Sequence, residues 1–257
     1  MKQIDMNIRR IMDIAKRAYQ SNCYTYTDFL NINELSEFNR LEKDFAFIEH
    51  REFGGLANSE RKMIQFGSMS EFGYEEEFPI EIIKISPLSV KFASECSHRD
   101  YLGALMNLGI DRSLIGDIKI DGLFAYVFCV ARIANLICES IDKVSRVSVK
   151  SEIVTYDEEE KKKIEEIFNR FEEREILVAS ERVDAVVAAL TRLSRSQAVE
   201  LFRTGKVFIN GCVNENNSYY LKPQDELVIR GYGKYIFVER HGESRKGRLY
   251  IKIKVYA

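Results

Sequence analysis

Apolar residues recur at helical spacing at the beginning of the chain. Ile8, Ile11, Met12 and Ala15 fall on one face if residues 1–20 form a helix. Such a face usually packs against a core, so an amphipathic core-packing helix is predicted here rather than a membrane anchor.

Capping residues predict more helical structure in the first 77 residues. Thr27 or Asp28 is placed to cap a second helix, and Asn58 or Ser59 is placed to cap a helical turn. We therefore expect an N-terminal α/β region, mainly helical, over residues 1–77.

Residues 78–155 show strand and helix patterns in the order β-α-β-β-α-β. The predicted strands are 79–85, 115–120, 123–130 and 146–154, the predicted helices are 98–108 and 131–141, and Asp121-Gly122 is the predicted hairpin turn. This is the ferredoxin-like order, which the RNA-recognition (RRM) fold shares, so an RRM-like domain is expected. The order alone does not imply RNA binding.

Three aromatic residues alternate along one of these strands. Phe124, Tyr126 and Phe128 must share a face of the sheet, because successive side chains of a strand point to opposite faces. We favour a core face packed against other elements, and the alternative is an exposed face that binds a partner in a protein-interaction scaffold.

The segment 156–175 is strongly charged. Ile164, Ile167, Phe168 and Phe171 fall at helical spacing within it, so it is predicted to be a solvated linker helix with one apolar stripe.

Residues 176–257 predict two short helices followed by strands. Ser180 is placed to cap a helix and Ser194 a second one, and Asn210-Gly211 is a predicted hairpin turn. The predicted strands are 207–210 and 226–230, followed by a closing hairpin with a polar tip at 241–247. The whole pattern predicts an α+β protein.

Composition narrows the class of protein. The chain has 257 residues, of which 46% are hydrophobic and 30% charged, with no apolar run long enough for a membrane span. The N-terminus lacks the apolar region of a secretory signal, and the five cysteines form no C-x-x-C pair. We expect a cytoplasmic monomer without a metal site or membrane contact.

The small net charge of −2 hides an asymmetry. From Val178 onward there are 14 Lys and Arg against 8 Asp and Glu, about +6, and the preceding part has 24 against 32, about −8. This separation favours a polyanion-binding C-terminal domain, and the alternative is chance variation in surface charge.

Three short stretches resemble catalytic motifs without completing them. His98-Arg99-Asp100 lacks the spacing of a kinase catalytic loop, and the turn 231–234 is too short for a phosphate loop. Arg182-Val183-Asp184 resembles the catalytic Arg-Leu-Asp of pseudouridine synthases without the residues that normally follow. We predict no catalytic residue and no cofactor. The alternative is an RNA-modifying enzyme, of pseudouridine synthase or methyltransferase type, that the C-terminal domain targets to RNA.

The stretch 181–235 resembles the alpha-L module, the small RNA-binding domain named after ribosomal protein S-four. The resemblance rests on two helix starts, the Asn210-Gly211 turn, and the later Pro223, Asp225 and Gly231. It implies that the second helix and the hairpin grip the backbone of structured RNA. The expected RNA-binding residues are Arg182, Arg192, Ser194, Arg195, Ser196, Gln197, Arg203, Lys206, Asn210 and Lys234.

Elementary chemistry supports this use of the second helix. Its N-terminal amides can bind phosphate oxygens, and Arg195 adds a planar, bidentate hydrogen-bond donor. For Ser194 and Asp184, capping is an equally good interpretation. A DNA-binding helix-turn-helix is disfavoured, because a hairpin follows the second helix directly.

Two further stretches, GGLANSERKMIQFG at 54–67 and SHRDYLGALMNLGIDRSLIGDI at 97–118, resemble signatures of the bacterial YlmH family. The resemblance implies an N-terminal region, a central RRM-like domain and a C-terminal alpha-L domain. It further implies a non-enzymatic factor in ribosome-associated quality control that binds ribosomal RNA on the large subunit and a peptidyl-tRNA. Some members of the family are linked to cell division.

Overall fold

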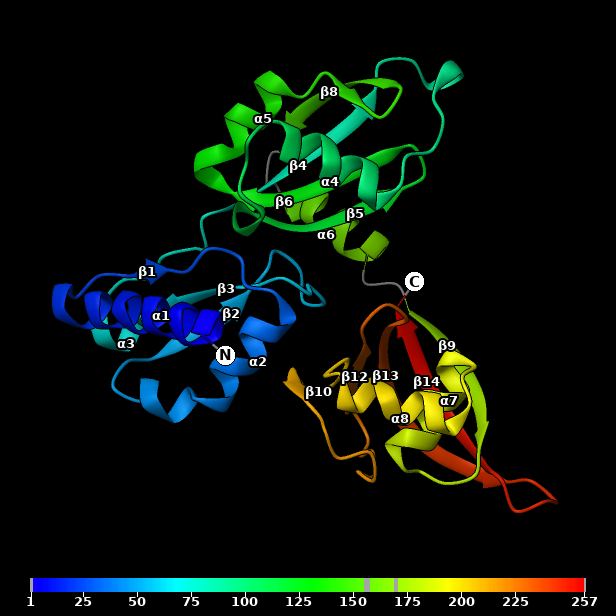
Figure 1. Cartoon of the computed structure of the whole chain (residues 1–257). Helices are drawn as coiled ribbons and strands as arrows, with labels where there is room; N and C mark the ends of the chain where they lie inside the picture. Colours follow the sequence, from blue (N-terminus) through cyan, green and yellow to red (C-terminus); the bar gives the residue numbers. More distant parts are fainter. Residues whose placement is uncertain (1, 155–157, 169–170, 257) are drawn as a thin grey trace. The chain divides into compact units, whose positions relative to one another are not determined.

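The computed structural model describes residues 2–154, 158–168 and 171–256, and the chain divides into two compact units, residues 1–168 and 169–257 (Figure 1). Both units combine helices with antiparallel sheets, so the fold class is α+β, as predicted.

The first part of unit 1 packs helices on a small sheet of order β1-β3-β2. Its elements are α1 (Lys2–Ser21), β1 (Thr25–Tyr26), α2 (Ile32–Arg40), β2 (His50–Phe53), β3 (Met63–Phe66) and α3 (Met69–Phe72). Ile11 and Ala15 of α1 are buried with Phe38 and Phe66, which confirms the core-packing face of the first helix.

The predicted caps of this region are wrong. Asn31, not Thr27 or Asp28, caps α2, and it forms a capping box with Glu34. Thr27 is buried, and its hydroxyl accepts a hydrogen bond from the Ile64 amide at 2.9 Å.

The helical turn expected after residue 58 is also absent from the described structure. The chain enters strand β3, which pairs with β1 and β2 on its two edges and is buried along its whole length. The Ser59 hydroxyl accepts a hydrogen bond from the Leu56 amide at 3.1 Å, so it stabilises the preceding turn.

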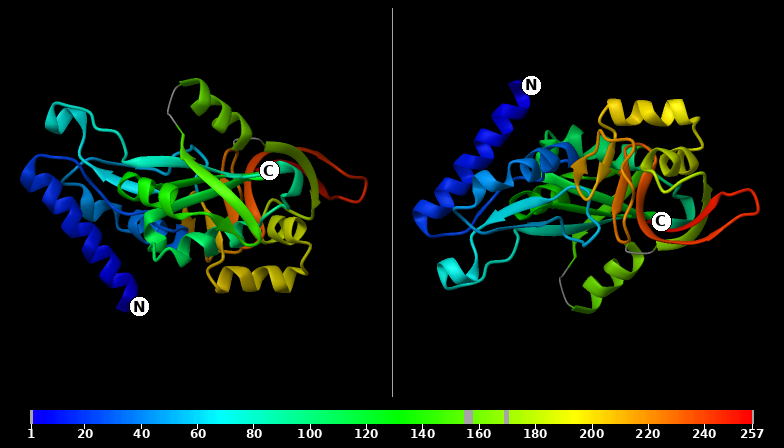
Figure 2. Two further views of the ribbon diagram at one scale, coloured as in Figure 1. Left: turned by 90° about the horizontal axis from the view of Figure 1, so that it is seen from above. Right: turned by 90° about the horizontal axis from the view of Figure 1, so that it is seen from below.

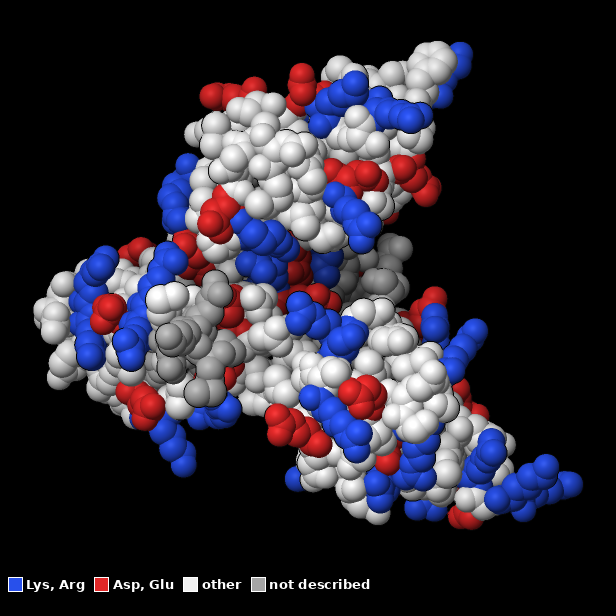
Figure 3. All heavy atoms as spheres, in the orientation of Figure 1, with Lys and Arg blue, Asp and Glu red and all other residues white. Residues whose placement is uncertain are grey.

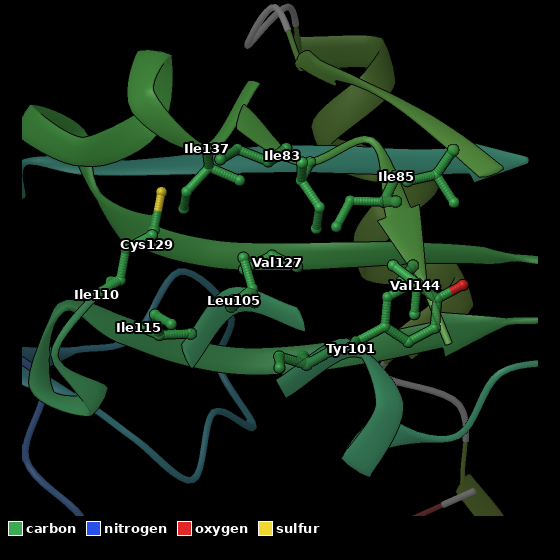
Figure 4. Packing of buried hydrophobic residues seen from close by; sticks show 14 of the residues in the cluster. Ile83, Ile85, Tyr101, Leu105, Ile110, Ile115, Val127, Cys129, Ile137 and Val144 are labelled. Atoms are coloured by element: carbon green, nitrogen blue, oxygen red, sulfur yellow. The ribbon is translucent and has the colours of Figure 1, made fainter. Parts of the chain in front are cut away.

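The second part of unit 1 is a five-stranded sheet of order β5-β6-β4-β8-β7. Its elements are β4 (Ile80–Pro87), α4 (His98–Asn107), β5 (Ile115–Asp121), β6 (Phe124–Val130), α5 (Ala134–Ser140), β7 (Lys143–Val144) and β8 (Val147–Ile153). Leu105 and Ile137, from the two helices, pack on Ile83 and Val127 of the central strands (Figure 4). The expected hairpin turn is displaced by one residue: Asp121 pairs with Phe124, and Gly122 adopts a φ of 59°.

The opposite face of this sheet is covered as well. Phe29, Leu56 and Met63 pack on it from the first part of the unit, together with Ile164 and Phe168 of α6 (Glu158–Phe168), which lies behind the sheet in Figure 1. Tyr126 and Phe128 are therefore only 6% and 0% exposed, which confirms the core interpretation for these two rings. An exposed three-ring face is not formed, and Phe124, at the end of the row, is half-buried.

Unit 2 is built on a six-stranded antiparallel sheet of order β11-β10-β12-β13-β14-β9. Its elements are β9 (Phe171–Val178), α7 (Val183–Thr191), α8 (Arg195–Arg203), β10 (Val207–Ile209), β11 (Cys212–Val213), β12 (Glu226–Ile229), β13 (Gly233–Glu243) and β14 (Leu249–Tyr256). Both helices lie on one face of the sheet in the two views of Figure 2. On this face Val187 and Phe202 of the helices pack on Ile229 and Ile251 of the strands. The Asn210-Gly211 turn is formed as predicted, since Ile209 pairs with Cys212.

The segment predicted as a linker helix over 156–175 contains two different elements. Residues 156, 157, 169 and 170 lie outside the described residues. Helix α6 buries Ile164 and Phe168 in unit 1, whereas Phe171 begins a strand of unit 2. Strand β9 forms because every residue from Phe171 to Val178 is paired with β14, and Lys252 Nζ lies 2.8 Å from a Glu173 carboxylate oxygen.

No helix in the described ranges is long and apolar enough to cross a membrane. Over the same ranges, no group of three or more His, Cys, Asp or Glu side chains has a metal-binding arrangement.

Candidate nucleic-acid interface

A buried carboxylate joins the two helices of unit 2. Asp184, in the first turn of α7, has a side chain only 2% exposed, and its amide donates to the Asn217 carbonyl at 3.2 Å. Arg182 binds it through Nε at 3.2 Å and Nη2 at 3.1 Å. Arg195, at the start of α8, binds the same carboxylate through Nε at 3.2 Å and Nη2 at 3.0 Å. Asp184 therefore holds two guanidinium groups side by side.

The two arginines keep unused donors. Each binds Asp184 through its Nε/Nη2 edge, so the Nη1 amino groups make no hydrogen bond within the described residues. The side chains of Arg182 and Arg195 are 32% and 55% exposed, and the group of three carries one net positive charge. It is a fixed cationic site that solvent reaches.

The N-terminal end of α8 adds backbone donors to this site. Ser194 and Gln197 form a capping box, in which the Ser194 hydroxyl accepts from the Gln197 amide at 3.3 Å and the Gln197 side chain accepts from the Ser194 amide at 3.0 Å. Ser194 therefore caps the helix, one of the two interpretations left open. The amides of Arg195 and Ser196 make no hydrogen bond in the described part of the chain, and such amides bind anions.

A second cationic group lies at the other end of α8. Arg203 is 75% exposed, and its one ion pair with a described residue is a surface pair with Glu200 at 3.6 Å. Lys206 is exposed, and its carbonyl accepts from the amide of Arg230 at 2.9 Å, which places the exposed Arg230 beside it. Arg195 and Arg203 are separated by roughly 12 Å along the helix, at about 1.5 Å per residue.

Arg230 and Asp184 were not among the predicted site residues. The signal for Arg230 is its place directly before the Gly231 turn, where a strand ends at the surface. The signal for Asp184 is an acidic residue in a first helical turn with an arginine two positions before it.

Two predicted contact residues are drawn into the fold instead. Asn210 donates through Nδ2 to Asp225 at 2.9 Å and accepts from the Glu226 amide at 2.9 Å, so its amide group fixes the hairpin. Lys234 has a side chain only 10% exposed, with Nζ 2.8 Å from Glu226 and 5.3 Å from the centre of the Tyr256 ring. Neither side chain joins the cationic groups.

Arg192 lies in the short connection between the helices. It ends α7 in a left-handed conformation, with a φ of 58°, and its side chain is exposed. Within the described ranges it makes no ion pair, so its charge remains available to a ligand.

Replacing Asn210 by glycine should destabilise unit 2 with little direct effect on RNA binding. Glycine tolerates the φ of 50° at this turn, so the loss reports the two hydrogen bonds, including one to the buried Asp225, and is expected to be about 1–3 kcal/mol. Urea unfolding would measure it. Asn214→Gly is the matched control, because within the described ranges the Asn214 side chain bonds only to the backbone of Asn216. An equal loss there would contradict the assignment.

The face of unit 2 that carries α7 and α8 shows several Lys and Arg side chains, and more gather at the tip of the β13–β14 hairpin (Figure 3). That tip begins at Ser244 rather than at residue 241, and Arg245, Lys246 and Arg248 are exposed in it.

Comparisons with known proteins place the chain among its relatives. Residues 74–158 match a family model described as "Putative RNA-binding domain in YlmH". A relative from Bacillus subtilis (strain 168), "Ribosome-associated protein quality control protein P2", is 28% identical over 195 residues, which cover 76% of this chain and 73% of that protein. The solved structure "Cell division protein ylmH from Streptococcus pneumoniae" is 21% identical with a TM-score of 0.48, covering 61% of this chain and 93% of that one. The family model covers the second of the two signature stretches, residues 97–118, and over residues 74–158 the chain is similar to the YlmH family.

Proposed function

We propose that this protein binds structured RNA through unit 2 and acts as a ribosome-associated factor without catalytic chemistry of its own. The names of the family model and of the Bacillus relative support this proposal. Within it, the ligand is ribosomal RNA of the large subunit, with peptidyl-tRNA as a second RNA contact.

The observation that carries the proposal is the pair of arginines held by Asp184. Fixing a guanidinium in advance lowers the entropy cost of binding, and guanidinium groups match phosphate oxygens in geometry. The free amides of Arg195 and Ser196 beside them are a second phosphate-binding element.

The same contacts argue against a pseudouridine synthase. The Asp184 carboxylate, which resembles the catalytic aspartate of that class, is buried and binds two guanidinium groups. A nucleophile must reach its substrate, and this carboxylate is enclosed by its partners.

The architecture supports two domain assignments within the proposal. Residues 78–155 form an RRM-like domain, supported by the strand order β5-β6-β4-β8 with α4 and α5 on one face. Residues 176–257 form an alpha-L domain, supported by α7, α8 and the hairpin around Asn210.

Salt dependence of RNA binding tests the proposal. The full chain should bind purified large-subunit ribosomal RNA with a log–log salt slope of roughly −4 to −5 if about six phosphates are contacted. Filter binding over a range of KCl concentrations measures the slope, and a separately folded RNA of unrelated sequence measures selectivity. An absence of binding at low salt would refute the proposal.

A further inference from the structure

The central sheet of unit 1 cannot present Tyr126 and Phe128 to a ligand, because the first part of the unit and α6 cover both rings. The open surface lies at the far end of the same sheet. There the chain leaves β4 and forms a loop with a single 3₁₀ turn, Val90–Phe92, before α4.

This loop exposes large apolar side chains. Leu88, Val90 and Phe92 are 65%, 60% and 83% exposed, and all three lie within five consecutive residues. Lys91 Nζ lies 5.6 Å from the centre of the Phe92 ring. Contiguous exposed apolar groups of this kind commonly mark binding sites.

Cations surround the loop on the side of the neighbouring hairpin. The Leu88 amide donates to the Ser148 carbonyl at 2.9 Å, so the loop lies beside β8. Lys143 is opposite Ser148 in the register, Lys150 is two residues further along β8, and Arg146 is in the β7–β8 turn. Figure 3 shows Lys and Arg side chains beside the projecting loop at this end of unit 1.

These cations are available to a ligand. Lys91, Lys143, Arg146 and Lys150 are exposed, and no described carboxylate lies within ion-pair distance of any of them. The combined surface, which we call the 88–92 loop surface, consists of Leu88, Phe92 and these four cations.

We propose that the 88–92 loop surface binds RNA at an unpaired base, which stacks on Phe92 while the four cations contact the flanking phosphates. Apolar side chains alone would suit a protein, but four unpaired cations around one exposed ring match the alternation of bases and phosphates in a single strand. This inference rests on the proposed RNA-binding function and assigns a second RNA contact to unit 1.

The composition of the chain allows a direct test. The protein contains no tryptophan, so Phe92→Trp introduces a single tryptophan at the loop, and its emission can be excited selectively over that of the tyrosines. A single-stranded RNA of twelve uridines should quench its emission, because a stacked base contacts the indole. Tyr19→Trp, at a 60% exposed position of α1, is the matched control and should keep its emission. Phe92→Ala should weaken binding of the same RNA by roughly 5- to 100-fold.

A second pair of variants tests the phosphate contacts. Arg146→Glu with Lys150→Glu should reduce the salt slope for the same RNA by about 1.4, at about 0.7 for each contact to a single strand. Lys16→Glu with Arg17→Glu changes the net charge equally at exposed positions of α1 and should leave the slope unchanged.

The outcomes separate this inference from the proposed function. If ribosomal RNA binds through Arg195 but the uridine strand leaves the tryptophan at position 92 unquenched, only the 88–92 loop surface is refuted. If ribosomal proteins freed of RNA change that emission and RNA does not, the loop binds protein and the assignment is wrong. If the wild type binds neither RNA, the proposed function fails together with this inference.

Discussion

Replacing Arg195 by alanine is expected to weaken binding of large-subunit ribosomal RNA by about 10- to 100-fold, the range for loss of a hydrogen bond to a charged group. The log–log salt slope should fall by about one unit, because one phosphate contact is removed. The effect on folding should be small, since Arg182 still neutralises Asp184 and the Arg195 side chain is 55% exposed.

Two variants control for the interpretation of this result. Arg195→Lys keeps the charge but loses the two-pronged grip, so the salt slope should be preserved while the affinity falls. Arg40→Ala removes an arginine of unit 1 that is 71% exposed and, among the residues that the structure describes, pairs only with Glu37. It should behave like the wild type. Equal losses in Arg40→Ala and Arg195→Ala, or an unchanged slope in Arg195→Ala, would remove Arg195 from the interface.

The sequence predicts local structure well where that structure depends on residues close together in the sequence. The helix cap at Ser194, the Asn210-Gly211 turn and the start of α4 at His98 all depend on residues within a few positions. The same is true of the strand and helix order of the central sheet, in which the hairpin turn is displaced by one residue and the short edge strand β7 is added.

The wrong predictions concern segments whose structure depends on residues far away in the sequence. Strand β9 has the composition of a solvated helix, and its pairing with β14, more than 70 positions later, overrides that preference. Thr27 has the chemistry of a cap, but the Ile64 amide binds its hydroxyl. Asn210 and Lys234 are polar residues in an RNA-binding pattern, and Asp225 and Glu226 bind them within the fold.

Some residues of the candidate site could be predicted from the sequence, and others could not. Arg195 could be predicted, because a helix start with an arginine is visible in the sequence. Its partner Asp184 could not be identified as such, since the two lie eleven positions apart and only the packing of α7 on α8 joins them. The proximity of Arg230 to Lys206 likewise depends on the pairing of β12 with β10.

The two signature stretches of the family meet at one buried carboxylate. Asp117 lies in a β-bulge of β5, and its side chain is only 8% exposed. It accepts hydrogen bonds from the amides of Glu60 and Arg61, at 2.9 and 3.0 Å. The Arg61 side chain in turn donates to the carbonyls of Ile115 and Phe29, at 2.9 and 2.8 Å, and burial lowers its pKa. This network joins the first part of unit 1 to the central sheet.

Asp117→Ala is therefore expected to destabilise unit 1 by about 3 kcal/mol, because it leaves two amides without an acceptor and removes the negative charge beside the half-buried Arg61 guanidinium. For a unit of this size the melting temperature should fall by about 6–12 °C, which calorimetry would detect.

Asp117→Asn keeps one acceptor oxygen and should lose about half as much stability. Asp121→Ala, at an exposed position of the same strand, should stay within about 0.5 kcal/mol of the wild type. If Asp117→Ala were as stable as Asp121→Ala, the Asp117 carboxylate would not be what holds the two stretches together.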